Sequence, residues 1–375
     1  MLELDLQPSR TPKSKQVSAD VTCRPLEETS TDITHRGAGR VTAKGGESQL
    51  LAAENQLLRE EVNRLAAADR YKAARLTFSQ ISESDALVNY YTSLPNAKVF
   101  KTLVTYISML DFEYYQHKVD VLVLEDQILM FLMKLRHNFG HTDLSVRFAV
   151  SMSTVTNILR TFISVFAEAL YKPVLGKGVT SREKNRGSMP ASFEKFQNCR
   201  TTIDCTEIHI QKPDNTNNKA STYSAYKARN TFKLMVGVAP NGTINFVSGV
   251  YGGNASDKQI AATSGLLEQL DAGDLVLADK GFSIGDIVPT GVTVNTPAFL
   301  FQPQFTKEEV LHNREVAEAR IHVERAIARL KLYKILDAIP HQFRNIVNAL
   351  VKVCAVMTTF QNPIIAQHRL MDRSK

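Results

Sequence analysis

The sequence has no tryptophan, and its cysteines are few and scattered. The four are Cys23, Cys199, Cys205 and Cys354, and no two of them form a C-x-x-C pair. Zinc ribbons and disulfide frameworks need paired cysteines, so the sequence argues against both and fits a reducing compartment. Glycine and proline, 18 and 13 of 375 residues, are too few for a collagen-like or linker-dominated chain.

Long uninterrupted apolar runs are also absent. Glu125 and Asp126 break the apolar segment 121–133, and Lys352 breaks the segment 346–356. A membrane-spanning helix needs about 20 consecutive apolar residues, so the sequence predicts no membrane association. The first residues contain no apolar core of a secretory signal, so we expect no signal peptide.

The familiar local signatures of cofactor and hydrolase sites are missing too. The sequence contains no G-x-G-x-x-G, no Walker A loop, no G-x-S-x-G and no H-E-x-x-H. Nucleotide-binding and zinc-protease sites of those types are therefore not expected. A Ser/His/Asp triad assembled only by folding stays open.

The composition that remains is that of a globular protein with excess positive charge. Hydrophobic residues make up 43% and charged residues 22%, and the length predicts about two domains. Lys and Arg number 45 against 38 Asp and Glu, which gives a net charge of +7. Such a charge indicates a polyanionic partner and carries no information on the fold.

The positive charge is concentrated around one short apolar segment, 201–210. Before it, residues 172–200 contain seven Lys or Arg against two Glu. After it, residues 211–233 contain five against one Asp. Tyr223 and Tyr226 lie among the basic residues of the second stretch. Basic side chains with interleaved aromatics suit a nucleic-acid backbone, although an ordinary solvated surface is the alternative.

The N-terminal part divides into a predicted disordered tail, 1–46, and a helical segment, 47–82. A seven-residue repeat runs through the second, with leucine at one seam position and Asn or Val at the other: Leu51, Leu58, Leu65, Asn55 and Val62. This pattern predicts a short coiled coil, and Asn at an a position favours a homodimer in register. An amphipathic helix packed on its own domain is the alternative.

Residues 83–171 have helical periodicity and end in a predicted helix-turn-helix at about 121–166. A break at 150–153 separates two short helices, and Ser151 and Ser153 are candidate N-caps for the second. Polar residues follow on what we expect to be its exposed, DNA-contacting face: Thr154, Asn157, Arg160 and Thr161. A plain helical hairpin is the alternative.

The C-terminal part changes from helical to strand periodicity. Residues 172–192 contain Gly176, Gly187 and Pro190 and are interpreted as an interdomain linker. Residues 193–365 begin with strand-like segments and then alternate strands with helices, which predicts an α/β domain with a mixed sheet. Residues 366–375 are a predicted tail.

Three acids in this domain form a candidate catalytic and metal site. Asp204 lies inside an apolar strand, Asp279 ends the short strand 275–279, and Glu324 lies in a long helix, 307–336. A carboxylate in an apolar strand is costly unless it is paired or metal-bound. If the three converge, they form an oxygen-only site suited to Mg²⁺ or Mn²⁺ and to phosphoryl transfer. Taken singly, each could be structural.

A basic stripe accompanies Glu324 on its helix. His322, Arg325 and Arg329 lie beside it and could bind DNA phosphates. Alternatively they pair with the helix's own glutamates, Glu315 and Glu318, at helical spacing.

These motifs resemble a known family. The run IDCTEIHIQKP, then YSAYKARNTFKLMVGVAPNGTINFVSGVYGGNASDKQI, GDLVLADKGF and EARIHVERAIARLK resemble the DDE endonuclease domain of Harbinger/IS5-like transposases. Residues 121–166 resemble the helix-turn-helix that precedes this domain in the branch often carrying a THAP zinc finger. The resemblance covers about residues 98–365.

The resemblance implies an RNase H-like catalytic core whose three metal ligands are Asp204, Asp279 and Glu324. It further implies Mg²⁺-dependent cleavage of DNA at transposon ends and strand transfer, in the nucleus, with a Myb-like protein as a possible partner. Predicted DNA-contacting residues in this core are Lys227, Arg229, Lys280, Arg325 and Arg329. Ser256 and Asp257 match a family Ser-Asp pair that is expected to cap a helix.

One departure from the family pattern concerns the N-terminus. A THAP finger needs a C-x₂₋₄-C pair and a later C-x₂-H, and upstream of the predicted core the chain has only Cys23. The alternative function is therefore a domesticated DNA-binding protein that keeps the DDE fold without transposition. A metal-dependent nuclease acting on RNA or damaged DNA is a third hypothesis.

Overall fold

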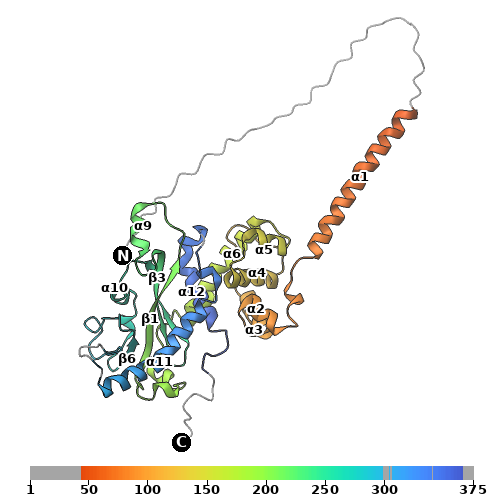
Figure 1. Cartoon of the computed structure of the whole chain (residues 1–375). Coiled ribbons are helices and arrows are strands. Elements are labelled where there is room, and N and C mark those ends of the chain that lie inside the picture. The colour runs from red at the N-terminus through yellow and green to blue at the C-terminus, as the bar shows by residue number, and fades with distance from the viewer. Residues whose placement is uncertain (1–43, 299–303, 305, 340, 366–375) are drawn as a thin grey trace, which may run out of the picture. The chain divides into compact units, whose positions relative to one another are not determined.

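The computed structural model describes residues 44–298, 304, 306–339 and 341–365. Most of the predicted disordered tail, 1–46, and the predicted tail 366–375 lie outside the described residues. The chain divides into two units, Met1–Arg64 and Leu65–Lys375. Figure 1 shows helices in the N-terminal half of the chain and a sheet with helices in the C-terminal half.

A 30-residue helix, α1 (Lys44–Ala73), contains the predicted coiled-coil segment. Every side chain from 51 to 64 is exposed to solvent. The structure has a helix where one was predicted, but it starts before residue 47 and ends at Ala73, well short of the predicted residue 82.

A helical region follows. Its elements are α2 (Asp85–Thr92), α3 (Ala97–Ser108), α4 (Leu124–His137), α5 (His141–Arg147) and α6 (Met152–Phe166). Side-chain caps fix several of the starts, because Ser84 accepts a hydrogen bond from Leu87 N and Asn96 accepts one from Val99 N. Every residue of α4 from Asp126 to Leu135 is buried, so α4 is the central helix of this region.

Helices α5 and α6 form the predicted helix-turn-helix. Ser151 is the N-cap of α6, as expected, and its hydroxyl accepts a hydrogen bond from Thr154 N at 3.1 Å. The turn before it contains Ala149 in the left-handed region, at φ 51°. The two helices pack on each other, and α6 also packs on α4.

The segment 172–192, predicted as an interdomain linker, has its own packed structure. After a π-helical turn (Ala167–Tyr171), it forms α7 (Lys172–Val174), α8 (Arg182–Arg186) and a short 3₁₀ turn (Ala191–Phe193). Apolar side chains along it are buried, including Leu175, Val179 and Met189. This segment between the helical region and the sheet therefore contributes side chains to the hydrophobic cores that it connects.

The C-terminal region forms the predicted mixed sheet. Its strands are β1 (Cys199–His209), β2 (Tyr223–Ser224), β3 (Arg229–Val238), β4 (Ile244–Val247), β5 (Tyr251–Gly252), β6 (Leu275–Ala278) and β7 (Thr293–Asn295). The order along the sheet is β2-β3-β1-β6-β7, and β4 and β5 also pair with β3. Strand β1 is antiparallel to β3 and parallel to β6, and β6 is parallel to β7.

The predicted P-N-G hairpin connects β3 and β4. Gly242 adopts φ 85°, a conformation that glycine reaches without strain. The turn closes with hydrogen bonds from Gly242 N to Ala239 O and from Ala239 N to Thr243 O.

Helices cover both faces of the sheet (Figure 1). Helices α11 (Lys307–Leu330) and α12 (Val347–Thr358) pack on one face. Helix α10 (Asp257–Thr263) packs on the other, where Ile260 belongs to the same hydrophobic cluster as Ile203 and Met235. The short helix α9 (Thr216–Thr222) lies next to β3 and β5. Antiparallel strands leading into parallel ones, with helices on both faces, confirm the predicted RNase H-like α/β core.

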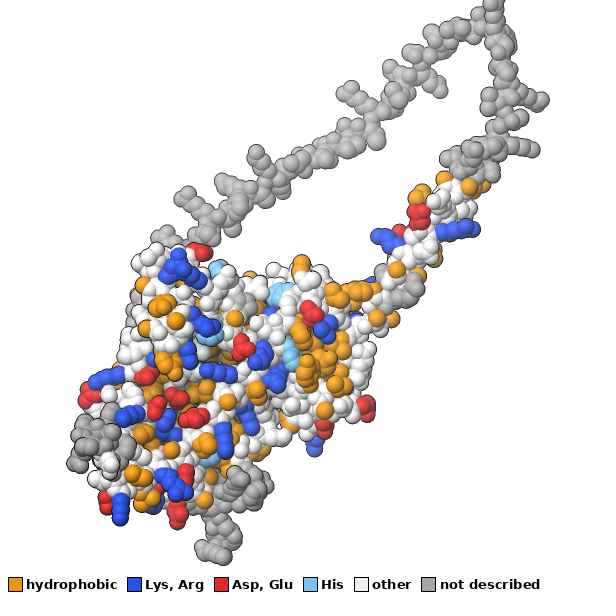
Figure 2. Space-filling view, viewed as in Figure 1, with side chains coloured by type: hydrophobic (Ala, Val, Ile, Leu, Met, Phe, Trp, Pro, Cys, Tyr) orange, Lys and Arg blue, Asp and Glu red, His pale blue; other side chains and the backbone are white. Residues whose placement is uncertain are grey.

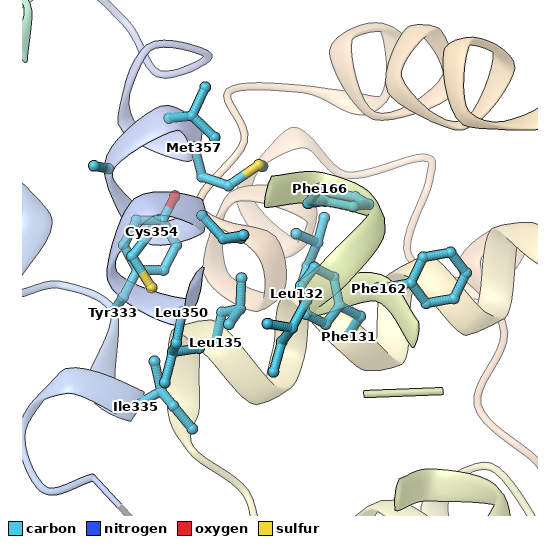
Figure 3. Close-up of a cluster of buried hydrophobic side chains, with 14 of the residues drawn as sticks. Phe131, Leu132, Leu135, Phe162, Phe166, Tyr333, Ile335, Leu350, Cys354 and Met357 are labelled. Carbon is cyan, nitrogen blue, oxygen red and sulfur yellow. The ribbon is translucent and has the colours of Figure 1, made fainter. Parts of the chain in front are cut away.

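One hydrophobic core joins the helical region to this sheet. It contains side chains of α4 and α6 together with β3, α11 and α12. Figure 3 shows Phe131 and Leu135 of α4, Phe166 of α6, and Leu350 and Met357 of α12 pointing toward one another. The helical region and the sheet are therefore packed as one body.

Within the described residues, no single helix is long and apolar enough to cross a membrane. The bent pair of α5 with the helix Met152–Val174 has the required length and composition, but it turns through 103°.

Candidate active site

The two strand acids lie side by side. In the register of the parallel strands β1 and β6, Ile203 is paired with Ala278. The residues that follow this pair, Asp204 and Asp279, therefore lie next to each other across the two strands. Neighbouring strands are about 4.8 Å apart. Strand β6 ends at Ala278, so Asp279 begins the loop that leaves the sheet.

Asp204 is half-buried and is costly to ionise. Burial raises the pKa of its carboxyl to about 6, and the negative charges of Asp279 and Asp257 act in the same direction. A hydrogen bond from Cys205 N to Oδ1, 2.8 Å long, and the positive charge of Arg320 oppose this shift. The sheet thus holds a carboxylate in surroundings that favour a cation.

An arginine of α11 supplies positive charge beside the two aspartates. Arg320 Nη1 lies 3.1 Å from Asp279 Oδ1, and the arginine side chain is only 10% exposed. Asp279 also accepts a hydrogen bond at Oδ1 from Lys280 N, 2.7 Å away. Arg320 is a site residue that sequence reasoning did not assign. Its one signal was a basic residue one helical turn before Glu324.

Glu324 follows Arg320 on the edge of α11 that faces the two aspartates. In an α-helix, positions i, i+4 and i+11 lie along one side, which places Arg320, Glu324 and Lys331 on a common edge as α11 ends. Residues at both ends of this edge interact with Asp204. The positive charge of Arg320 lowers the pKa of Asp204. At the other end, desolvation and the charge of Lys227 lower the pKa of Lys331, and the negative charge of Asp204 opposes this lowering. The Glu324 side chain is exposed, and it makes no hydrogen bond or ion pair with any described residue.

The other acid near this site is Asp257, the first residue of α10. Lys233 Nζ lies 2.7 Å from its Oδ1. Ser256 is the N-cap of α10 and accepts a hydrogen bond from Gln259 N at 3.1 Å, so the prediction that Ser256 caps a helix is confirmed.

Comparison with known families gives two matches. Residues 203–359 match the family described as DDE superfamily endonuclease. Residues 121–172 match the helix-turn-helix of DDE superfamily endonuclease. The chain carries a DDE superfamily endonuclease domain preceded by its helix-turn-helix. No curated protein matches the chain.

Endonucleases of the DDE superfamily generally use divalent metal ions, so the acids of this DDE domain can be tested as ligands. In the described part of the chain, no group of three or more His, Cys, Asp and Glu side chains could hold a metal ion. Two of the three predicted ligands, Asp204 and Asp279, are neighbours, and Glu324 lies on the adjacent helix edge. Two adjacent carboxylates, one of them half-buried with a raised pKa, suit a hard cation such as Mg²⁺.

The predicted DNA-contacting residues of the DDE domain have different surroundings. Lys227 and Arg229 are exposed, and Lys227 Nζ lies 4.4 Å from the centroid of the Tyr226 ring. Lys280 and Arg325 are exposed too. Figure 2 shows that basic side chains on the visible face are interspersed with acidic ones.

Arg329 differs from the other members of the predicted basic stripe. It is half-buried and its Nη1 donates a hydrogen bond to the carbonyl oxygen of Asn362, so it holds the C-terminal segment in place. His322 is buried and its Nε2 lies 3.1 Å from Ser192 Oγ. Of the three residues in the predicted basic stripe, Arg325 alone is therefore exposed.

The helix-turn-helix exposes less of its second helix than predicted. Asn157, expected on the exposed face, is fully buried: its Oδ1 accepts a hydrogen bond from Gln116 N, and its Nδ2 donates one to His117 O. The neighbouring Thr161 is also buried and accepts a hydrogen bond from Tyr115 N. The loop before α4 covers this polar face.

The other two predicted residues of α6 are partly accessible. Arg160 stacks on the Tyr115 ring, 4.9 Å from its centroid, and donates a hydrogen bond to Gln342 O. Thr154 is half-buried in the first turn, beside the exposed Met152 and Ser153. The surface that α6 offers to a ligand is therefore its N-terminal turn.

Proposed function

We propose that this protein is a transposase-type DNA endonuclease that cleaves transposon ends and transfers the released strands, with Asp204, Asp279 and Glu324 as metal ligands. The neighbouring positions of Asp204 and Asp279 on parallel strands carry this proposal. They bring together two acids that are 75 residues apart in the sequence. The order and spacing of the motifs support the Harbinger/IS5-like branch.

In the proposed reaction, water attacks the phosphorus atom and the bond to the 3′ oxygen breaks, which leaves a 3′-hydroxyl and a 5′-phosphate. The hydroxyl then attacks a phosphodiester of the target DNA, so that one phosphodiester bond forms as another breaks. Bound Mg²⁺ would activate the nucleophile and stabilise the leaving oxygen. Asp204 and Asp279 would hold the ions from the sheet, and Glu324 would approach from α11.

Residues around the acids would bind the DNA backbone. Lys227 and Arg229 are exposed on one side, and Lys331 interacts electrostatically with Lys227 and Asp204. Phosphate contacts of this kind position DNA without reading its sequence. The N-terminal turn of α6 is the proposed contact of the helix-turn-helix with DNA. The nuclear location and a Myb-like partner belong to the same proposal and rest on the resemblance.

The test uses the full chain, Mg²⁺ and a supercoiled plasmid that carries the genomic segment encoding this chain with its flanks. We expect nicks at the ends of the segment that leave 3′-hydroxyls, detected by terminal labelling. Asp204→Asn and Asp279→Asn should lose this activity. Asp286→Asn is the matched control, because Asp286 is an exposed acid that pairs with Lys258. Equal nicking by all four proteins would contradict the proposal.

The alternative of a domesticated DNA-binding protein has one observation in its favour. Among the described residues the acids do not form a three-ligand group, and Arg320 already pairs with Asp279. This alternative predicts a gel shift that Asp204→Ala leaves unchanged, with no nicking by either protein. Preferential cleavage of RNA or damaged DNA in competition would instead favour the third hypothesis.

A further inference from the structure

Helix α1 exposes apolar side chains that a soluble helix would ordinarily bury. Leu51, Leu58, Val62 and Leu65 are 56%, 56%, 62% and 53% exposed. Single exposed leucines are common on protein surfaces, and Leu57 in the same 15 residues is one more, but four apolar side chains that share one side of a helix are typical of an interface. Figure 2 shows apolar side chains at the surface of this helix.

The spacing of these residues defines the shape of the partner. Leu51, Leu58 and Leu65 repeat every seven residues, and Asn55 and Val62 follow four residues after the first two leucines. They therefore occupy the d and a positions of a heptad repeat and form a narrow stripe along α1. A stripe of this width fits the same stripe of another helix in a coiled coil, whereas packing on a globular surface needs a wider apolar face.

Asn55 indicates how the two helices are aligned. Its Nδ2 donates a hydrogen bond to Leu51 O of its own helix, 2.9 Å away, and its Oδ1 has no hydrogen bond with a described residue. An asparagine at an a position is best satisfied by the same asparagine of a parallel, in-register partner. A second copy of this chain provides that residue.

The charges beside the stripe favour the same arrangement. Glu54 and Glu61 occupy g positions, and Arg59 occupies an e position. In a parallel pair, each g residue faces the e residue of the next heptad, so Glu54 of one chain faces Arg59 of the other, twice by symmetry. In an antiparallel pair, g faces g, which would bring the glutamates together. Glu61 already pairs with Arg64 in its own helix.

We propose that α1 is the interface of a homodimer in which two copies of this chain form a parallel two-stranded coiled coil from Leu51 to Leu65. The proposal does not rest on the nuclease activity and can be tested without DNA. The seam is short, so we expect an association that depends on protein concentration, because short helices gain little stability of their own.

The first experiment measures the mass of the full chain by sedimentation at several concentrations. We expect the wild type to approach twice its 41.8 kDa on concentration. Leu58→Glu should remain a monomer at the same concentrations. Leu57→Glu is the matched control, because Leu57 is 66% exposed on the same helix but lies at a c position, off the seam. It should dimerise like the wild type.

The second experiment tests orientation. Glu54→Lys should weaken the dimer, and the double variant Glu54→Lys/Arg59→Glu should restore it. In a Cys23→Ser background, Leu51→Cys should form an intermolecular disulfide on mild oxidation, while Leu57→Cys should form much less. A wild type that is monomeric at every concentration would overturn the proposal. So would a dimer that survives Leu58→Glu, or equal effects of Leu57→Glu and Leu58→Glu.

Discussion

The guanidinium of Arg320 lies 3.1 Å from the carboxylate of Asp279 and also lowers the pKa of Asp204. One arginine from α11 therefore offsets the negative charge of both strand acids. In protein without metal, this contact offsets part of the cost of ionising the half-buried Asp204. A divalent ion bound to the same oxygens would compete with it.

We expect Arg320→Met to destabilise the metal-free protein by about 1–2 kcal/mol at pH 7, because it removes the cation that contacts Asp279 and lowers the pKa of Asp204. We also expect Mg²⁺ to raise the melting temperature of this variant more than that of the wild type. Calorimetry in EDTA and in Mg²⁺ measures both effects. Arg325→Met is the control, since Arg325 is exposed on the same helix. A variant that gains no more from Mg²⁺ than the wild type would show that Arg320 does not compete with metal.

Asp204→Asn should stabilise the metal-free protein while it abolishes cleavage. The folded-state pKa of Asp204, about 6, lies above that of an unfolded aspartate. The native state therefore binds the extra proton between about pH 4 and 6, so its stability falls as the pH rises through this range. Asparagine removes the charge and can still accept the hydrogen bond from Cys205 N.

The expected gain is about 2 kcal/mol at pH 7, and it should vanish at pH 4. Urea unfolding in EDTA at the two pH values measures it. An equal effect at both would point to a change in packing instead of charge.

Lys134 predicts a second pH dependence, far from the acids. Its side chain is buried in α4, Nζ donates a hydrogen bond to Phe139 O at 2.8 Å, and desolvation lowers its pKa to about 8. Between about pH 8 and 10.5 the unfolded state binds more protons at this group, so Lys134 makes stability rise with pH there. Lys134→Met should remove this contribution.

The measurement is the difference in unfolding free energy between wild type and Lys134→Met at pH 7, 8, 9 and 10. The unfolding free energy of Lys134→Met should exceed that of the wild type by the largest amount at pH 7, and this difference should shrink as the pH rises. Lys101→Met, which replaces an exposed lysine, should give a difference that does not change with pH.

Substitutions of Asn157 and Ser153 should distinguish a structural role in α6 from a role in DNA contact. Asn157→Ala should lower stability by about 2 kcal/mol, because it leaves Gln116 N and His117 O without their buried partner. Ser153→Ala should leave stability unchanged and weaken a gel shift with DNA, because Ser153 is exposed in the first turn. Thermal unfolding and the gel shift, run on both variants, distinguish the roles. Weaker DNA binding by Asn157→Ala at full stability would contradict the structural role.

The sequence was sufficient to predict a mixed sheet with its main helices and to select the two aspartates, but it made their meeting conditional on the pairing of their strands. Hydrophobic alternation and the P-N-G turn are local signals, and Asp204 and Asp279 were notable as acids in or at the end of apolar strands. The position of Glu324 remains a prediction, because helical periodicity gives its side of α11 but not the reach of its side chain.

The residues that sequence reasoning misplaced depend on contacts between distant segments. Asn157 has the helical spacing of an exposed face, yet the loop containing Gln116 covers it. Arg329 has the spacing of a basic stripe, but the carbonyl of Asn362 binds it 33 residues later. The segment 172–192 has the glycines and proline of a linker, and its buried side chains appear only in the folded core.

The core shared by α4, α6 and α12 has a consequence for any DNA that contacts both the helix-turn-helix and the acids. Because no flexible tether separates the two regions, the distance from the first turn of α6 to the edge with Asp204 is a constant of the fold. The number of base pairs between a contacted site and a cut site would then be fixed by geometry. Inserting residues into 172–192 should disturb folding before it changes that number.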